Sequence, residues 1–373
     1  MVLKRIISVI LLFSLLSVYA AASGYDPQKA VETFGSAKVG AESCVVYSLD
    51  RNEVIFASNE NEQLPMASTT KIMTAILVLE HGDTEDTVKV PSEAVGVEGS
   101  SAYLMNGEQI LVKDLLYALM LESANDAATA LAIYTAGNVE AFVDMMNDKA
   151  AEIGMANTRF ANPHGLNHDQ HYSTAYDMAL LFDYAMDDPD FAQITSTYRY
   201  ETQNRLFINH NRLLKTCDGV IGGKTGYTKD SGRCLVSAAE RDGMQFCVVT
   251  LNDADDWKDH ARLYDEVFAL YERRTVSGGI YSIPIIGSEA ESLDVVLPDT
   301  SFVVDITTGQ ISVTVCHERF VYAPVQEGEC VGYAVYSCDG RELDRVELTS
   351  ERNIQKIKKK NFFEKIISFI FRN

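Results

Sequence analysis

The sequence has few of the features that mark several well-known classes of protein. Among its 373 residues, 32 are basic and 53 are acidic, so the formal net charge is −21. A protein that binds nucleic acid needs basic side chains against the phosphates, so this balance argues against a nucleic-acid partner. The chain also has no internal repeat and no low-complexity segment. Hydrophobic residues make up 47% of it, which indicates a globular protein with a large core.

The chain also lacks a Cys-x-x-Cys pair, and its seven cysteines are an odd number. Neither feature suits a disulfide framework in a chain of this length. Cys234 and Cys247 flank an expected hairpin turn at residues 241–243, which places them about four residues out of register and roughly 13 Å apart. This separation is too large for a disulfide bond, so we expect buried free thiols. We expect no metal site from clustered cysteines and histidines, and no cofactor.

The N-terminus lacks a hydrophobic run of membrane-spanning length. Lys4 and Arg5 precede an apolar run at residues 6–18, and small residues follow at 20–23. This order is typical of a secretory signal peptide, which we predict at residues 1–23. An uncleaved N-terminal anchor is the alternative. In either case we expect the body of the protein to lie outside the cytoplasm, on the outer face of the cytoplasmic membrane.

The last 20 residues combine apolar and basic side chains at helical spacing. The apolar ones are Ile354, Ile357, Phe363, Ile366, Ile367, Ile370 and Phe371. The basic ones are Lys356, Lys358, Lys359, Lys360, Lys365 and Arg372, against the single acidic Glu364. A cationic amphipathic helix over residues 354–373 suits an anionic membrane surface, so we predict that it tethers an acidic body to the membrane. The alternative is a helix docked on its own domain.

A chain of this length is expected to form two domains. In the first, at residues 24–275, the hydrophobic pattern predicts strands at 44–48, 53–57, 219–228, 234–240 and 245–251. Helices are predicted at 68–82, 113–122, 126–136, 139–154, 175–186 and 257–273. A helical insert between strands of an antiparallel sheet is an α/β (α+β) arrangement. Past 275–279, residues 280–350 show short alternating strands and no helical pattern, which predicts a small all-β sandwich domain.

Three short motifs indicate the chemistry. Ser68 and Lys71 form the only Ser-x-x-Lys of the chain, at the start of an apolar helix on which a three-residue step brings both side chains to one face. A serine hydroxyl beside a lysine amine suits a nucleophile whose base is a lysine. Ser123 and Asn125 form a Ser-x-Asn motif on a loop between two helices. Lys224-Thr225-Gly226 lies on a predicted strand.

This ordered triplet resembles that of the penicillin-recognising serine acyltransferases. Within that group it is most similar to the low-molecular-mass penicillin-binding proteins that are serine-type D-alanyl-D-alanine carboxypeptidases. The likeness extends to the surrounding segments PMASTTKIMTA (65–75), LMLESANDA (119–127) and NTRFANPHGL (157–166). Such enzymes carry a signal peptide, a small all-β domain and often a C-terminal amphipathic anchor. The resemblance therefore implies a penicillin-binding, β-lactamase-like transpeptidase fold and a role in cell-wall maturation.

The resemblance also implies roles for the motif residues. Ser68 attacks the carbonyl of the penultimate residue of a peptidoglycan stem pentapeptide and forms an acyl-enzyme, with Lys71 as the base. Burial and the charge of Lys224 are expected to lower the pKa of Lys71. Ser123 relays the proton to the leaving amine, and Asn125 binds a backbone amide of the substrate.

The strand motif is expected to hold the substrate. The Thr225 hydroxyl receives the terminal carboxylate, and Gly226 lets the substrate lie close to the strand edge. By resemblance, the backbone N–H groups of Ser68 and Tyr227 hold the oxyanion. β-Lactam antibiotics are expected as covalent inhibitors. The family often has a second cation that faces the carboxylate, for which Lys258 and Arg262 are the candidates.

Other functions remain as alternatives. A class A β-lactamase needs a glutamate that activates the deacylating water, and no convincing Glu-x-x-x-Asn segment lies between Asn125 and Lys224. A β-lactam sensor or scaffold that does not turn over is the alternative from another class, and a D,D-endopeptidase is the alternative within the family. His164 and His210 lie beside no Gly-x-Ser-x-Gly motif and are interpreted as ordinary loop histidines.

Overall fold

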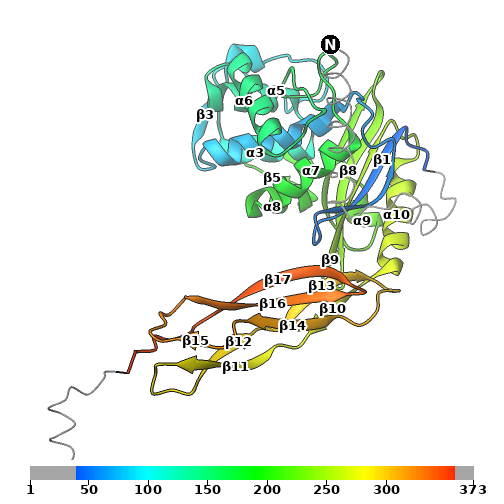
Figure 1. Cartoon of the computed structure of the whole chain (residues 1–373). Helices are drawn as coiled ribbons and strands as arrows, with labels where there is room; N and C mark the ends of the chain where they lie inside the picture. The colour runs from blue at the N-terminus through cyan, green and yellow to red at the C-terminus, as the bar shows by residue number, and fades with distance from the viewer. Residues whose placement is uncertain (1–38, 358–373) are drawn as a thin grey trace, which may run out of the picture. The chain divides into compact units, whose positions relative to one another are not determined.

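The computed structural model of the chain describes residues 39–357 (Figure 1). The chain divides into two compact units, Met1–Leu270 and Tyr271–Asn373. The signal peptide predicted for residues 1–23, and residues 358–373 of the predicted C-terminal helix, lie outside the described residues.

The first unit is built on a five-stranded sheet in the order β2-β1-β9-β8-β7, in which all neighbours are antiparallel. Its strands are β1 (Ser43–Ser48), β2 (Glu53–Ser58), β7 (Val220–Thr228), β8 (Gly232–Arg241) and β9 (Met244–Leu251). All five were predicted from the two-residue period, within two residues at each end. Because β1 pairs with β9, the sheet joins the beginning of the unit to its end. The strand that carries Lys224-Thr225-Gly226, β7, lies at an edge of the sheet.

Helices cover both faces of this sheet (Figure 1). Successive residues of a strand point to opposite faces, so each strand supplies two layers. On β8, Val236 belongs to the core beneath the helical block, where α7 (Ala175–Met186) packs against β1 and β9. Its neighbour Ser237 faces α10 (Asp256–Leu270), where its Oγ lies 2.8 Å from the Tyr264 hydroxyl. The sheet is therefore buried on both sides and forms a rigid support for the residues on β7.

The helical block lies between β2 and β7 in the chain. It begins with the 3₁₀ turn η1 (Ala67–Thr70) and contains α3 (Lys71–His81), α4 (Val112–Leu121), α5 (Asn125–Ala136), α6 (Val139–Glu152), α7 and α8 (Pro189–Ser196). Helix α3 packs against α4, α5, α6, α7 and α8, and its first eight residues are all buried. This central position explains why its sequence is apolar nearly all round. The shorter elements are η2 (Ser92–Ala94), β3 (Thr87–Lys89), β4 (Gln109–Leu111), β5 (Arg199–Glu201), β6 (Leu206–Ile208) and α9 (Leu213–Thr216).

The boundary between the units differs from the prediction. Helix α10 ends at Leu270, three residues before the predicted end at Arg273. The next residues form β10 (Tyr271–Val276), which pairs antiparallel with β13 (Thr300–Asp305) and belongs to the second unit. Half of the residues of β10 (Tyr, Thr and Val) favour strands, and their partners in β13 lie 24 to 34 residues further along the chain, beyond the reach of a local pattern. The catalytic domain predicted for residues 24–275 is therefore shorter at its C-terminal end.

In its described part the second unit contains strands and no helix, as predicted. Besides β10 and β13, its strands are β11 (Gly279–Ile286), β12 (Ser292–Leu297), β14 (Ser312–His317), β15 (Val321–Tyr322), β16 (Cys330–Cys338) and β17 (Arg341–Thr349). They form the sheets β10-β13, β12-β11-β15 and β14-β16-β17. A separate hydrophobic core, which includes Ile283, Val295 and Tyr336, lies between them. This arrangement agrees with the predicted sandwich.

The residues after β17 still belong to this second core. Ile354 forms a β-bridge with Val325 and is 6% exposed. Ile357 N–H donates to the Gly287 carbonyl at 2.8 Å. The predicted helix is therefore wrong for residues 354–357, because Ile354 fills a core position and holds the chain extended. No helix within residues 39–357 is both long and apolar enough to cross a membrane.

All seven cysteines are free, as predicted. Cys247 lies opposite Ala238, which is four residues along β8 from Cys234, so the offset inferred from the turn is confirmed. The thiols of Cys44, Cys234, Cys247 and Cys338 are buried, whereas Cys217 is half-buried and Cys316 and Cys330 are exposed. The expectation of buried thiols is thus wrong for the last three. Among the described residues, no group of three or more His, Cys, Asp or Glu side chains is placed to hold a metal ion.

Candidate active site

Ser68 and Lys71 meet at the start of the central helix. Ser68 lies in η1 and Lys71 is the first residue of α3, so the three-residue step places both on one face. Lys71 Nζ lies 2.9 Å from Ser68 Oγ. Ala67, directly before the serine, has a φ of 48°, a left-handed conformation that costs energy for a residue with a Cβ. The chain therefore turns sharply just before Ser68.

Lys71 is fully buried and surrounded by oxygen atoms. Its Nζ lies 2.7 Å from Asn125 Oδ1 and 2.5 Å from the His164 carbonyl oxygen, in addition to Ser68 Oγ. Asn125 Nδ2 donates to the Glu98 carbonyl at 2.5 Å, which fixes the amide with its oxygen toward the lysine. Burial, and then the positive charge of Lys224, hold the pKa of Lys71 well below its usual value.

These contacts fix the orientation of the amine when it is uncharged. An uncharged amine has two N–H groups and one lone pair. Asn125 Oδ1 and the His164 carbonyl can only accept hydrogen bonds, so they take the two N–H groups. The lone pair is then left for the Ser68 hydroxyl, which is the group that can donate. The geometry thus prepares Lys71 to receive the serine proton.

Lys224 is a second buried lysine, only 1% exposed, and its Nζ donates to the Thr225 carbonyl at 2.9 Å. Burial lowers the pKa of Lys224 to about 7. Its amine therefore changes charge in the neutral range. Because Lys224 is among the causes that lower the pKa of Lys71, the two lysines are coupled electrostatically.

Gly226, which lines the cavity described below, also has a structural role. A Cβ on this residue would lie 3.0 Å from the Ser68 nitrogen and 3.1 Å from the Met66 carbonyl oxygen. The missing side chain therefore lets η1 approach β7, so that the backbone of the nucleophile lies against the strand.

Ser123 lies in a strained turn between α4 and α5. Its φ is 59°, and it is 5% exposed. Its Oγ has no hydrogen-bond partner among the described residues. Asn125, predicted on the loop, is the first residue of α5, and its N–H donates to the Ser100 carbonyl at 2.7 Å. A buried hydroxyl without a partner, held in an unfavourable backbone conformation, is typical of a functional site.

The motifs converge on one cavity of about 540 Å³. Its walls come from η1, the α4–α5 turn, β7, β8, the start of α10, the segment before α9, and the loops that carry Ser100 and Tyr198. The lining residues are Ser68, Ser100, Ser123, Tyr198, Asn209, His210, Arg212, Thr225, Gly226, Tyr227, Arg233, Asp256 and Trp257. Tyr227, 67% exposed, lies at its rim. Asn125, Lys71 and Lys224 lie behind this surface. Lys71 contacts Ser68 and Asn125, and Lys224 contacts the Thr225 carbonyl oxygen.

The two residues suggested from the sequence as the second cation lie away from the cavity. Lys258 pairs with Asp255 and its side chain is 81% exposed, while Arg262 pairs with Asp259. Neither lines the cavity. Arg233, which does, was missed. The cross-strand pair Tyr227↔Arg233 places it beside the motif, so the register of the β7–β8 hairpin is the signal that could have found it.

Arg233 is held in a fixed position. Its Nη2 lies 2.7 Å from Asp256 Oδ1, and its guanidinium lies 5.2 Å from the centre of the Trp257 ring. Its Nε is buried and has no partner among the described residues. An arginine oriented in this way can present N–H donors to a carboxylate in the cavity.

Both histidines interpreted as ordinary loop residues lie at the site. His164 takes part through its backbone carbonyl, which binds Lys71; burial lowers the pKa of its ring to about 3, so the ring is neutral. His210 lines the cavity, and its Nε2 lies 3.4 Å from Glu122 Oε2. Burial and the charge of Lys224 lower the pKa of His210, against the opposing effect of Glu122.

The loop that carries His164 is fixed to the helical block. The Thr74 hydroxyl donates to the Pro163 carbonyl at 2.6 Å, and the Thr70 Oγ1 lies 2.7 Å from His171 Nε2. Gly165, with φ 91°, lies so close that a Cβ on it would be 1.9 Å from the Ala67 carbonyl oxygen. These contacts set the position of the carbonyl that orients Lys71.

A serine and a buried lysine one turn apart, beside the edge of an antiparallel sheet with a helical insert, define a serine peptidase of the penicillin-binding class. The sequence profile of the family described as "D-alanyl-D-alanine carboxypeptidase" matches residues 29–255. The chain belongs to this family, so the resemblance inferred from the motifs is confirmed. The family implies a peptidoglycan peptide as substrate and β-lactam binding.

Individual relatives agree with this assignment. The D-alanyl-D-alanine carboxypeptidase DacF of Bacillus subtilis (strain 168) is 30% identical over 375 residues, which cover 95% of this chain and 95% of that protein. A D-alanyl-D-alanine endopeptidase of Pseudomonas aeruginosa is 34% identical over 244 residues, which cover 62% of this chain and 77% of that protein. The crystal structure of penicillin binding protein 5 from Haemophilus influenzae superposes with a TM-score of 0.71 at 25% identity, and covers 86% of this chain and 99% of that one. The predicted fold class is therefore confirmed.

The coupling of the two lysines leads to a prediction. Replacing Lys224 by Gln removes a positive charge that lowers the pKa of Lys71, so that pKa rises. Because only neutral Lys71 can accept the serine proton, the acid limb of the pH–rate profile for acylation by a fluorescent penicillin shifts to higher pH, by roughly one unit. The exposed Lys113→Gln is the control and leaves the profile in place. An unshifted profile in Lys224→Gln contradicts the coupling.

Proposed function

We propose that this protein is a serine-type D-Ala-D-Ala carboxypeptidase that removes the terminal D-alanine from peptidoglycan stem pentapeptides through an acyl-enzyme on Ser68. The observation that carries the proposal is the buried Lys71 amine, whose Nζ lies 2.9 Å from Ser68 Oγ and within hydrogen-bond distance of two oxygen atoms that can only accept. The other parts of the site match the steps of this reaction.

In the first step, Ser68 Oγ attacks the carbonyl carbon of the penultimate residue, and its proton passes to Lys71 Nζ. The oxyanion that forms accepts hydrogen bonds from the backbone N–H groups of Ser68 and Tyr227. The close approach of η1 to β7 at Gly226 supports this assignment, because it brings the two backbone segments to one place.

In the second step, the C–N bond to the terminal residue breaks. The departing nitrogen takes a proton from the Ser123 hydroxyl, which regains one from Lys71, while Asn125 binds a backbone amide of the substrate. The unpartnered Oγ of Ser123 supports this relay, since substrate is then its missing partner. Water attacks the ester carbonyl by the same path in reverse, with Lys71 again as the base, and frees Ser68.

The terminal carboxylate lies between Thr225 and Arg233 in this proposal. Thr225 supplies a hydroxyl, and Arg233 a guanidinium oriented by Asp256 and Trp257. Lys224, behind Thr225, adds positive charge below the neutral range. A subsite that requires a free carboxylate restricts the enzyme to the end of a peptide, which distinguishes a carboxypeptidase from an enzyme that cuts within a chain.

The alternatives are less well supported. The family description and the relative that covers 95% of this chain both name a carboxypeptidase, whereas the endopeptidase matches 62% of it. A sensor or scaffold that does not turn over leaves unexplained why Ser123 is held in a strained conformation with its hydroxyl unpaired.

The main test is the release of D-alanine from a stem pentapeptide that ends in D-Ala-D-Ala, by the wild-type chain and by Ser68→Ala. The variant should retain the fold and lose release by at least about a thousandfold, because it has no nucleophile. A wild-type protein that is acylated by penicillin yet releases no D-alanine favours the sensor. Cleavage of a cross-linked peptide dimer in preference to the pentapeptide favours the endopeptidase.

The role of Arg233 is tested by replacing either Arg233 or Lys258 with glutamine. In Arg233→Gln the KM for the pentapeptide should rise roughly tenfold with a smaller change in kcat, because a charge-assisted hydrogen bond to the carboxylate is lost. Lys258→Gln, outside the cavity, should leave both constants near the wild-type values. If instead the KM rises in Lys258→Gln and stays near the wild-type value in Arg233→Gln, then Lys258 and not Arg233 binds the carboxylate.

We also propose that the protein is exported and held at the outer face of the cytoplasmic membrane. The signal-like residues 1–23 and the basic, apolar residues 358–373 support this. The second unit includes Ile354 in its core, so a truncation that tests the anchor has to begin after Ile357. Deleting residues 358–373 should move the protein from the membrane pellet to the supernatant while D-alanine release continues. A truncated protein that still pellets with membranes argues against the anchor.

A further inference from the structure

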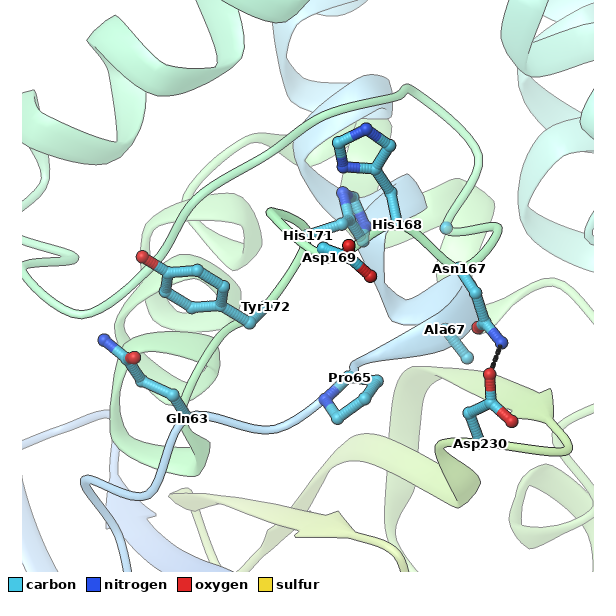
Figure 2. Close-up of a pocket in the computed structure, with 10 residues that line it drawn as sticks. Gln63, Pro65, Ala67, Asn167, His168, Asp169, His171, Tyr172 and Asp230 are labelled. Atoms are coloured by element: carbon cyan, nitrogen blue, oxygen red, sulfur yellow. Dashed lines mark hydrogen bonds between the residues drawn. The ribbon is translucent and has the colours of Figure 1, made fainter.

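The two oxygen atoms that can only accept hydrogen bonds from Lys71 are held by two different loops. The His164 carbonyl belongs to one loop, whose continuation is tied to the turn after β7 where Asn167 Nδ2 donates to the Asp230 carboxylate (Figure 2). Asn125 Oδ1 is the second acceptor, and a separate loop surrounds its amide. The position of the Lys71 amine therefore depends also on what holds Asn125.

Residues 98–104 form the loop that holds Asn125. The Glu98 carbonyl accepts a hydrogen bond of 2.5 Å from Asn125 Nδ2, and the Ser100 carbonyl accepts one of 2.7 Å from the Asn125 N–H. The first bond turns the amide so that its oxygen faces the buried amine. A Cβ on Gly99 would lie 2.7 Å from Asn125 Nδ2, so the loop fits closely around the amide. A shift of this loop therefore moves an acceptor of the base.

The residue after Asn125 holds this loop in place. Asp126 is 1% exposed, and its carboxylate accepts three hydrogen bonds from the loop. Oδ1 accepts the N–H of Ala102 at 2.9 Å, and Oδ2 accepts the Ser101 hydroxyl at 2.7 Å and the N–H of Leu104 at 3.0 Å. A fourth comes from the N–H of Ala127 at 2.9 Å, in the first turn of α5. Asp126 thus joins the loop to the helix that Asn125 begins.

The four donors to Asp126 are all uncharged groups. A buried carboxylate is costly unless its oxygens accept hydrogen bonds, so the loop cannot leave Asp126 without a large penalty. Arg205 holds the same loop, because its Nε donates to the Ala102 carbonyl at 3.0 Å and its Nη2 to the Tyr103 carbonyl at 3.3 Å. Glu108 pairs with this guanidinium. The loop is therefore fixed by its N–H groups to Asp126 and by its carbonyls to Arg205.

Asp126 also acts on Lys71 through its charge. Burial and then the charge of Lys224 lower the pKa of Lys71, and the negative charge of Asp126 opposes them. Arg205 lies within electrostatic range of Asp126 as well. The ring of His164 near Lys71 is neutral, because burial lowers its pKa to about 3. Lys224 and Asp126 are thus charges that act on the base in opposite directions.

We propose that Asp126 is a positioning residue for acyl transfer, which through the 98–104 loop fixes the amide of Asn125 and through that amide orients Lys71 toward Ser68. Asp126 itself touches neither the substrate nor the reacting atoms. The proposal rests on the part of the proposed function in which Ser68 is the nucleophile and Lys71 its base. It does not depend on whether the peptide is cut at its end or within.

The first test is the rate of acylation by a fluorescent penicillin as a function of pH, measured on the full chain. Asp126→Asn replaces a carboxylate oxygen by an NH2 group, so at least one donor of the loop loses its acceptor. Acylation should fall roughly tenfold or more, because hydrogen bonds to a charged group are lost. The acid limb of the profile should also move to lower pH, since the charge that favours protonated Lys71 is gone. The exposed Asp144→Asn makes the same change on α6 and should leave rate and profile unchanged.

Ser101→Ala separates the geometry from the charge. It removes one hydrogen bond between the loop and Asp126 and leaves the carboxylate in place. Acylation should fall roughly two- to fivefold, with the acid limb at its wild-type position. The exposed Ser92→Ala is the matched control and should keep the wild-type rate. Thermal unfolding followed by circular dichroism shows which variants are folded.

The outcomes are distinguishable. A folded Asp126→Asn protein that is acylated at the wild-type rate, or whose acid limb stays in place, overturns the proposal. If Asp126→Asn does not fold, Ser101→Ala decides: a reduced rate in a folded protein supports the proposal, and the wild-type rate overturns it. A wild-type protein that is acylated but releases no D-alanine overturns the carboxypeptidase and leaves the role of Asp126 standing. A wild-type protein that penicillin does not acylate overturns both.

Discussion

The arrangement of the catalytic unit depends on one buried amine. Lys71 is buried at the start of the apolar helix α3, and among residues 39–357 its amine hydrogen-bonds to no carboxylate. Charge at that position is costly, so burial favours the neutral form that a general base requires. The apolar sequence of α3 therefore has two roles. It makes α3 the central packing element of the helical block, and it buries the first residue of the helix, Lys71, in surroundings that lower the pKa of its amine.

The acceptors that orient this amine come from distant parts of the chain. Asn125 begins α5, and the His164 carbonyl belongs to a loop held on η1 by Thr70 and on α3 by Thr74. These contacts need close approaches of backbone, which glycines at 165 and 226 allow. The site is thus assembled from three segments that converge on the turn before α3, and a methyl group at either glycine forces backbone apart at the point of convergence.

Much of this organisation could be predicted from the sequence, because it depends on patterns among residues that are close together in the chain. The sheet strands alternate and the helices repeat, and the catalytic side chains lie in short motifs of fixed spacing. The place of Arg233 in the cavity was not predicted, because its position beside the motif depends on strand register. The contact of His164 with Lys71 was not predicted either, because it is made by a backbone carbonyl, which every residue type has. Ile354 was assigned to a helix by its spacing, although its bridge to Val325 overrides that local preference.

The pairing of β1 with β9 has a consequence for how the enzyme folds during its synthesis. About two hundred residues separate partners such as Val45 and Val249, so the sheet closes late as a chain grows from its N-terminus. Ser68 is synthesised early, whereas β7, the strand that lies against its backbone, follows about 150 residues later. β7 is in turn held in the sheet by β8, which pairs with β9. A growing or truncated chain that stops short of β9 holds the nucleophile without its site. The order of strands thus delays peptidase activity at least until β9 has been synthesised.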